Sequence, residues 1–380
     1  MIVLADGLLA LATLGGGAGL ASVWALDRQF ERAAAPATTT QPVTLLRPLH
    51  GSEPGLAERL AALVAQDYGA PVQLVCGVQR NDDPATAVVR ALQAERPELD
   101  IALVIDACRH GSNAKVSNLI NMMVAARHDV LVLSDSDILV GPDWLERITS
   151  ALGQPGVGAV TALYTGYATV SGMSSRLAAM AVSYQFLHSV ALGLELGLAR
   201  PCMGSTIALT RATLERIGGF AAVADELADD YEIGRAVRGL GLKVAVPALL
   251  VGHAHRETSI AQLWRQESRW ARTIRAIDGS GHCGQGVTFF LPLALLGALA
   301  AGFAPIANVV LVAALAVRLL QKQQIDQMTA QSAGPVWLLP LRDSISLAVW
   351  AGSYFVRNIE WRGMQHRLGT GGVLLEGRLT

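Results

Sequence analysis

The stretch Val130-Leu131-Val132-Leu133-Ser134-Asp135-Ser136-Asp137-Ile138 decides the fold that this sequence predicts. Its four leading apolar residues are typical of a strand that is buried on both faces inside a parallel sheet. The strand runs directly into two carboxylates, Asp135 and Asp137. Ligands of open α/β sheets bind outside the carboxyl ends of the strands, and such a pair can hold a divalent cation that grips a diphosphate. Taken alone, the pair more often marks an exposed strand end or a helix cap.

The composition indicates a membrane protein. Hydrophobic residues make up 52% of the 380 residues and charged ones 16%, with a mean hydropathy of +0.38. These values exceed what an ordinary soluble enzyme carries. A net charge of −1 gives no basis for electrostatic capture of nucleic acid. The four cysteines lie far apart and form no metal-binding or disulfide pattern, so we expect reduced, mostly buried thiols.

Residues 1–26 are almost wholly apolar and long enough to cross a bilayer. A signal peptide is the competing interpretation, but no basic stretch precedes the apolar run and no clear cleavage site comes after it. Residues 27–42 are predicted to contain a linker. Within them, Arg28 and Arg32 favour a cytoplasmic position for the residues C-terminal to the linker.

Between residues 43 and 258, strand-like and helix-like segments alternate. This order predicts an α/β domain with a mostly parallel, Rossmann-like sheet. Residues 157–163 and 244–251 are each expected to form one continuous strand. Residues 171–198 form a long apolar helical stretch that either packs on the domain or lies in a membrane surface.

The C-terminal third is expected to contact the membrane. Residues 259–286 predict an amphipathic helix in which Trp264 and Trp270 contrast with several arginines. Such a helix suits a bilayer surface, and the alternative is a surface helix packed on the domain. Residues 287–320 are apolar and interrupted by prolines, which predicts a membrane hairpin. Residues 321–380 hold a third apolar segment and a basic tail, whose arginines favour the cytoplasm although four spans would place the tail outside.

Three further polar clusters lie where one site would need them. Asn81-Asp82-Asp83 comes after the second expected strand, Asp229-Asp230 opens a later helix, and Gln266-x-x-Arg269-Trp270 lies on the amphipathic helix. Each cluster also has a plain structural interpretation, as a turn with a helix cap, a helix-dipole pair or interfacial anchors. Their joint order with Asp135 and Asp137 favours a shared site.

That order resembles the ceramide glucosyltransferase family of membrane-bound, inverting glycosyltransferases with the GT-A fold. The resemblance covers nearly the whole chain, and hopanoid-pathway lipid glycosyltransferases share the same pattern. It rests on Leu45-Leu46-Arg47-Pro48-Leu49-His50-Gly51, Cys76-Gly77-Val78-Gln79-Arg80-Asn81-Asp82-Asp83-Pro84-Ala85, Asn113-Ala114-Lys115-Val116-Ser117-Asn118-Leu119, Asp135-Ser136-Asp137, Asp229-Asp230-Tyr231, Arg265-Gln266-Glu267-Ser268-Arg269-Trp270, and Glu360-Trp361-Arg362-Gly363 with Arg367-Leu368.

The resemblance implies how a UDP-sugar donor is held. Asp83, more than Asp82, would contact the uracil and ribose, and Lys115 would help to bind the nucleotide. Asp135 and Asp137 would hold Mg²⁺ or Mn²⁺ on the diphosphate, where the cation neutralises the charge that develops on the departing UDP.

The resemblance also implies the chemistry and the acceptor side. Asp230 would be the general base that takes the proton of the acceptor hydroxyl, and in-line attack would convert an α-linked donor into a β-glycoside. Gln266, Arg269 and Trp270 would close over the diphosphate and line the acceptor mouth. His188 lies where the family carries a histidine near the acceptor site, and a packed or interfacial histidine is the alternative.

Two histidines and one cysteine carry weaker signals. His253 and His255 come after a strand near the expected site and could complete a metal shell, but the resemblance does not cover them. Cys202 lies in a small-residue loop at 201–205 that looks like the family's donor-side loop, where its thiol would pack rather than react.

The sequence therefore predicts a membrane-anchored glycosyltransferase that forms a β-glycolipid from a UDP-sugar and a lipid acceptor. The alternatives are a processive polysaccharide synthase, which usually needs more membrane helices, and a non-catalytic nucleotide-sugar-binding scaffold. The donated sugar, and the choice between ceramide and hopanoid as acceptor, stay open. The Ala-, Gly- and Arg-rich composition favours a bacterial inner (plasma) membrane with the catalytic domain in the cytoplasm.

Overall fold

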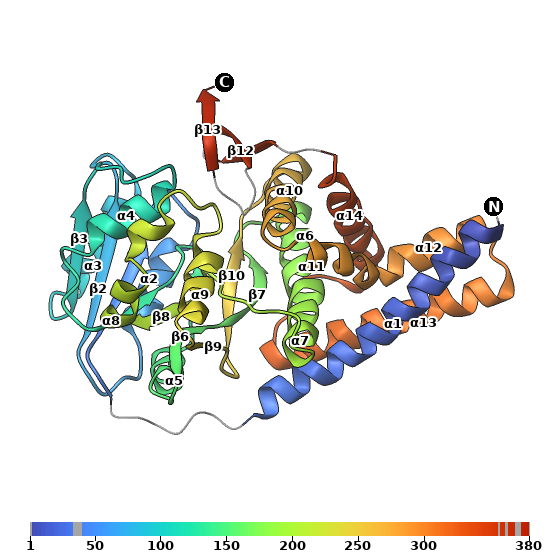
Figure 1. Ribbon diagram of the computed structural model, residues 1–380, viewed down its shortest axis with the longest axis horizontal. Helices are drawn as coiled ribbons and strands as arrows, with labels where there is room; N and C mark the ends of the chain where they lie inside the picture. The colour runs from blue at the N-terminus through green and yellow to red at the C-terminus, as the bar shows by residue number, and fades with distance from the viewer. Residues whose placement is uncertain (1, 33–39, 356–357, 362–363, 369–373, 380) are drawn as a thin grey trace.

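The computed structural model describes residues 2–32, 40–355, 358–361, 364–368 and 374–379 (Figure 1). Within the predicted linker, residues 33–39 lie outside this description. So do the side chains after Phe355, and with them the C-terminal part of the family resemblance.

A seven-stranded sheet forms the centre of the domain predicted at residues 43–258. In sheet order its strands are β3 (Asp100–Ile105), β2 (Val72–Val78), β1 (Val43–Pro48), β4 (Val130–Leu133), β8 (Ile207–Thr210), β6 (Val157–Thr161) and β9 (Lys243–Ala245). The first four are parallel, β8 is antiparallel to β4 and β6, and β9 is parallel to β6. The α/β prediction is confirmed.

Helices cover both faces of this sheet, which explains why all four residues of β4 are buried. Val132 packs into one core with residues of α2 (Leu56–Val64), α3 (Ala85–Glu95) and α5 (Trp144–Leu152). Leu131 and Leu133 point to the opposite face. The core there includes residues of α4 (Ala114–Met122), α8 (Arg211–Arg216) and α9 (Asp229–Gly239). The turn after β4 is therefore left at the open end of the sheet.

A second, three-stranded sheet lies beside this turn. It has the order β5 (Ile138–Leu139), β10 (Leu250–His255) and β7 (Leu163–Ala168). The prediction of single strands at 157–163 and 244–251 is wrong, because each of these segments divides between the two sheets. The carbonyl of Ala162 accepts the Ser205 hydroxyl at 2.8 Å at the first break. The second break, in the segment 244–251, contains Pro247, which has no N–H to donate to a neighbouring strand.

The apolar helical stretch predicted at 171–198 forms three consecutive pieces: α6 (Met173–Ala181), a π-helical turn η1 (Val182–Phe186) and α7 (Leu187–Glu195). Together they are long and apolar enough to cross a membrane, yet 61% of the span is buried inside the protein. The reason is visible in Figure 1, where they lie between the sheet domain and the remaining helices.

Helices α1 (Ile2–Glu31), α12 (Phe290–Ala300) and α13 (Pro305–Thr329) form an elongated bundle that extends away from the sheet domain (Figure 1). The hairpin expected at 287–320 is present. However, α1 and α13 run beyond the expected ends at residues 26 and 320. Within the described residues, three helices are long and apolar enough to span a membrane, or up to four if the bent pair of 279–288 and α12 counts as one.

Glycines allow the helices of this bundle to approach closely. A Cβ at Gly19 of α1 would lie 2.8 Å from Val317 and 2.9 Å from the Phe290 ring, and one at Gly297 would lie 2.8 Å from Leu9. Apolar burial gives little drive for association between helices within lipid, so close packing through small residues is the expected means.

The helix predicted at 259–286 divides at Asp278 into α10 (Ile260–Ile277) and α11 (Gly279–Gln285), because the Asp278 carboxylate caps α11 at the Gly281 N–H. The third C-terminal apolar segment is α14 (Leu339–Gly352), which has 14 residues. It is shorter than the roughly 20 residues that a span needs. Three short strands, β11 (Asn358–Trp361), β12 (Met364–Leu368) and β13 (Leu374–Leu379), form a small sheet in the expected tail.

A buried ion pair ties α14 to α10. Arg342 donates to both carboxylate oxygens of Glu267 at 2.7 and 2.6 Å, and to the Ser346 hydroxyl at 3.0 Å. The Arg342 side chain is 1% exposed and that of Glu267 10%. Such a pair is costly to break from one side, since the partner is left as an uncompensated buried charge.

We predict that Arg342→Met lowers the stability of the protein by roughly 3–5 kcal/mol. The double variant Arg342→Met/Glu267→Met should recover most of that loss, because no unpaired charge remains. Thermal unfolding in detergent, followed by tryptophan fluorescence, measures both, and Arg90→Met at an exposed position is the control. A double variant no more stable than Arg342→Met would contradict this interpretation.

Candidate active site

One cavity of about 870 Å³ brings most of the predicted site residues together. It lies where the open end of the sheet meets α10 and the apolar helices. The predicted residues that line it are Lys115, Asp135, Asp137, Asp230, Gln266, Arg269 and Trp270. These seven residues therefore line one cavity, as expected from the order of the motifs.

Two buried arginines hold the turn that carries Asp135 and Asp137. Arg47 donates to the Ser134 hydroxyl at 2.8 Å and to the Ile138 carbonyl at 2.6 Å, and Arg59 donates to the Ser136 carbonyl at 2.8 Å. Burial lowers the pKa of Arg47 to about 10, although Asp137 opposes the shift. Arg47 belongs to a segment quoted for the resemblance, but its role depends on a contact across the sheet that sequence reasoning missed.

Lys115 joins two of the carboxylate motifs. Its ammonium lies 2.8 Å from Asp135 and 3.1 Å from Asp229. Asn113 sets this position, because its side chain caps α4 at the N–H groups of Lys115 and Val116 and donates to Asp229 at 3.2 Å. Burial opposes the charge on Lys115, but Asp135 and Asp229 outweigh it and raise the pKa above its ordinary value.

The backbone of Gly204 connects Asp135 to Asp230. Its N–H donates to the Asp230 carboxylate at 2.8 Å, and its carbonyl accepts the Asp135 N–H at 3.0 Å. A Cβ at this position would overlap the Asp135 carboxylate. Sequence reasoning singled out the neighbouring Cys202, which is buried, and missed the glycine.

The electrostatic environment differs among the three carboxylates. Burial raises the pKa of Asp135 to about 6, against the attraction of Lys115. Burial and then Asp229 raise the pKa of Asp230 above its ordinary value. For Asp137, burial acts in the same direction, but His253 and Arg47 outweigh it and lower the pKa. Asp137 is therefore the most firmly ionised of the three.

The aspartate pair has the chemistry of a site for a hard divalent cation. Asp137 Oδ1 is buried and has no hydrogen-bond partner within the described residues, although it lies on a side chain that the cavity reaches. His253 Nε2 lies 3.4 Å from Asp137 Oδ2. No group of three or more His, Cys, Asp and Glu side chains in the described part of the chain has metal-binding geometry. The pair fits Mg²⁺ or Mn²⁺ provided that substrate and water oxygens complete the shell.

The Gln-x-x-Arg-Trp segment of α10 faces the same carboxylates. Arg269 donates to Gln266 at 3.2 Å. The Trp270 ring meets the rings of His253 and His255 edge-on, at 5.9 and 6.4 Å between centroids. The two histidines stand on one face of β10, two residues apart, and this spacing was the available signal that they belong together.

Two predicted substrate-binding residues do not line the cavity. Asp83 is buried behind it and accepts the N–H groups of Gly51 and Ala85 at 2.9 Å. It is connected to the cavity through His50, whose ring nitrogen lies 3.5 Å from its carboxylate. His188 is 1% exposed and bonds to Gln324 of α13 at 2.9 Å. His188 thus packs against α13, which agrees with the alternative that the sequence left open, and its contact with an acceptor stays a prediction.

Comparison with known families identifies the group of proteins to which this chain belongs. The model of glycosyl transferase family 21 matches residues 7–374. The chain is a member of this family. Ceramide glucosyltransferase 1 of Caenorhabditis elegans is 23% identical over 253 residues, covering 66% of this chain and 53% of that protein. The ceramide glucosyltransferase of Komagataella phaffii is 32% identical over 117 residues, covering 30% of this chain and 23% of that protein.

The chain spans about half the length of the first of these relatives. Among solved structures, the mannosyltransferase PcManGT from Pyrobaculum calidifontis, in complex with GDP-Man and Mn²⁺, superposes with a TM-score of 0.57 at 20% identity. The match covers 93% of this chain and 99% of that one. The family 21 chain therefore has the expected GT-A fold.

We predict that Gly204→Ala weakens the binding of UDP in the presence of Mn²⁺ by about ten-fold or more, because the added methyl displaces the Asp135 carboxylate. Isothermal titration of the purified protein measures this affinity. Gly239→Ala, at a helical glycine with open space around it, is the matched control and should bind as the wild type does. Equal affinity of both variants would show that Asp135 takes no part in binding.

Proposed function

We propose that this family 21 chain is an inverting, metal-dependent glycosyltransferase. It moves one sugar from a UDP-sugar to the hydroxyl of a lipid acceptor, a ceramide or a hopanoid, and forms a β-glycolipid. The observation that carries this proposal is the cavity itself. It is lined both by Asp135, Asp137 and Asp230 and by the apolar residues Phe289, Val349 and Trp350.

The donor is held at the carboxylate end in this proposal. Asp135 and Asp137 bind Mg²⁺ or Mn²⁺ together with the diphosphate, and the cation supplies neutralisation of charge on the leaving group. Arg269, whose planar fork suits phosphate oxygens, lines the same cavity from α10. Lys115 offers a second cation near the same place. Asp83 contributes to donor binding indirectly. It holds His50 and the Gly51 turn in place and does not itself line the cavity.

Asp230 is the proposed general base. It lines the cavity, and the N–H groups of Gly204 and Tyr231 fix its carboxylate at 2.8 Å each. Burial and then Asp229 raise the pKa of Asp230, which makes its ionised carboxylate a better proton acceptor than that of an ordinary aspartate. A hydroxyl beside Asp230 can lose its proton as it attacks the anomeric carbon from the side opposite UDP.

The membrane parts support a lipid as acceptor. A lipid keeps its chains in the bilayer and presents only its head, so the catalytic domain must lie against the membrane. We place that domain on the cytoplasmic face of a bacterial inner membrane. Arg28 and Arg32 at the end of α1 support this side, and both pair with Glu195.

Incubating membranes that contain the chain with radiolabelled UDP-sugars tests this function. We predict one lipid-soluble product that carries a single sugar in a β-linkage. An insoluble polymer would favour a processive synthase, and no transfer from any UDP-sugar would favour a scaffold. Asp230→Asn should lower transfer by roughly 10²- to 10⁴-fold while UDP binding persists. Asp225→Asn, at an aspartate outside the cavity lining, is the control.

The proposed base also predicts a pH dependence. Because Asp230 must be ionised to accept a proton, kcat should fall as pH decreases through its pKa. Burial and Asp229 raise that pKa, so the acid limb should lie above 3.8, the ordinary value of an aspartate. A pH–rate profile at saturating donor and metal measures it. A profile that is flat down to pH 4 would contradict the assignment.

A further inference from the structure

One glutamine in the wall of the cavity has no partner of its own. Gln185 is 7% exposed and lines the cavity. Within the described residues, its side-chain amide makes no hydrogen bond, and neither of its polar atoms is sealed from solvent. Buried polar groups in proteins are normally bonded, and water can bond this amide because its polar atoms open into the cavity. A substrate that enters the cavity can take the place of that water.

The backbone around Gln185 is shaped to present this side chain. The residue lies in the π-helical turn η1, and such turns occur frequently at functional sites. Ser183 fixes the turn to β7, accepting the Gly166 N–H at 2.9 Å and donating to the Gly166 carbonyl at 3.2 Å. Tyr184 fixes it on another side, where its hydroxyl donates to Asp326 at 2.6 Å. Gln185 and Phe186 are left to face the cavity.

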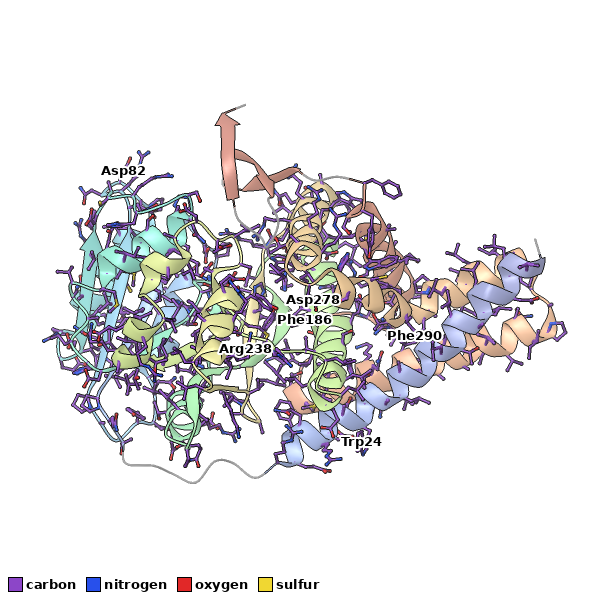
Figure 2. The ribbon with its side chains drawn as sticks, in the orientation of Figure 1. Trp24, Asp82, Phe186, Arg238, Asp278 and Phe290 are labelled. Carbon is purple, nitrogen blue, oxygen red and sulfur yellow. The ribbon has the colours of Figure 1, made fainter. Side chains whose placement is uncertain are left out.

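The cavity that Gln185 lines also contains Asp135, Asp137 and Asp230. The ring of the neighbouring residue Phe186 stacks on Tyr164 at 4.8 Å between centroids. The Tyr164 ring lies 5.4 Å from that of His253, which is itself 3.4 Å from Asp137. Figure 2 shows Phe186 at the junction between the sheet domain and the helices.

We propose that the Gln185 amide is a specificity-determining substrate contact, which hydrogen-bonds a hydroxyl-bearing group beside the carboxylates. A side-chain amide both donates and accepts, as a hydroxyl does, so the two groups match. The stacked rings of Phe186 and Tyr164 offer an apolar face next to it. Two substrates carry such hydroxyls, namely the sugar of the donor and the polar head of the lipid acceptor. This inference rests on the proposed function and adds a residue to it.

The test compares Gln185→Leu with the wild type in three assays on the full-length protein in detergent micelles. These are transfer with varied UDP-sugar, transfer with varied lipid acceptor, and slow hydrolysis of the UDP-sugar without acceptor. We expect kcat/KM for one substrate to fall roughly ten-fold, the effect of losing one neutral hydrogen bond. A contact with the sugar also impairs hydrolysis and weakens discrimination between epimeric UDP-sugars. A contact with the acceptor raises only the KM for the lipid.

Stability separates this role from a structural one. Because the Gln185 amide bonds to no side chain or backbone group among the described residues, Gln185→Leu should leave the thermal unfolding temperature unchanged or higher. Gln321→Leu is the matched control, since that buried amide bonds to Ser22 at 2.9 Å and to Arg318 at 2.7 Å and its loss should destabilise. Unchanged kinetics in all three assays, or destabilisation by Gln185→Leu, overturns the inference. Absence of transfer by the wild type instead overturns the proposed function.

Discussion

The ammonium of Lys115 makes the carboxylate cluster possible. It lies between Asp135 and Asp229, within a cavity that also contains Asp137 and Asp230. Burial disfavours the ionised form of a carboxylate and neighbouring carboxylates add to the effect, so Asp135 and Asp230 both have raised pKa values. Without the ammonium, the cheapest response would be protonation, and a protonated aspartate neither binds a cation nor accepts a proton. The surrounding segments of the domain hold the Lys115 ammonium in this position.

Four chain segments meet around that charge, and each is positioned by its own local structure. Asn113 caps α4 and so places Lys115 at its first turn. Asp135 lies in the turn directly after the buried strand β4, and the first turn of α9 supplies Asp229 and Asp230, where the helix dipole favours negative charge. Gly204 then joins two of these segments through its backbone alone. These motifs are far apart in the sequence. They meet in space because each lies beside the end of a strand or the start of a helix at the same edge of the sheet.

Sequence reasoning predicted what local patterns determine. The apolar run of β4 and the amphipathic pattern of α10 are both visible in a few consecutive residues. It failed where the answer depends on a partner elsewhere in the chain. Arg47 has no visible role until β4 lies beside β1, and His188 looks like an acceptor ligand until α13 supplies Gln324. The prediction of continuous strands at 157–163 and 244–251 failed for the same reason. A run of β-forming residues does not show which sheet each residue joins.

The segment from Met173 to Glu195 shows how neighbours decide the role of an apolar helix. By length and composition it could cross a membrane, yet β7 covers one side of it and α1 runs along another. A regular α-helix would repeat its faces every 3.6 residues. The π-turn inserts an extra step, so that Ser183 and Tyr184 stay bonded to their neighbours while Gln185 and Phe186 reach the cavity. The helix is apolar because it is enclosed between a sheet and a membrane bundle, and it is irregular because it also forms a wall of the site.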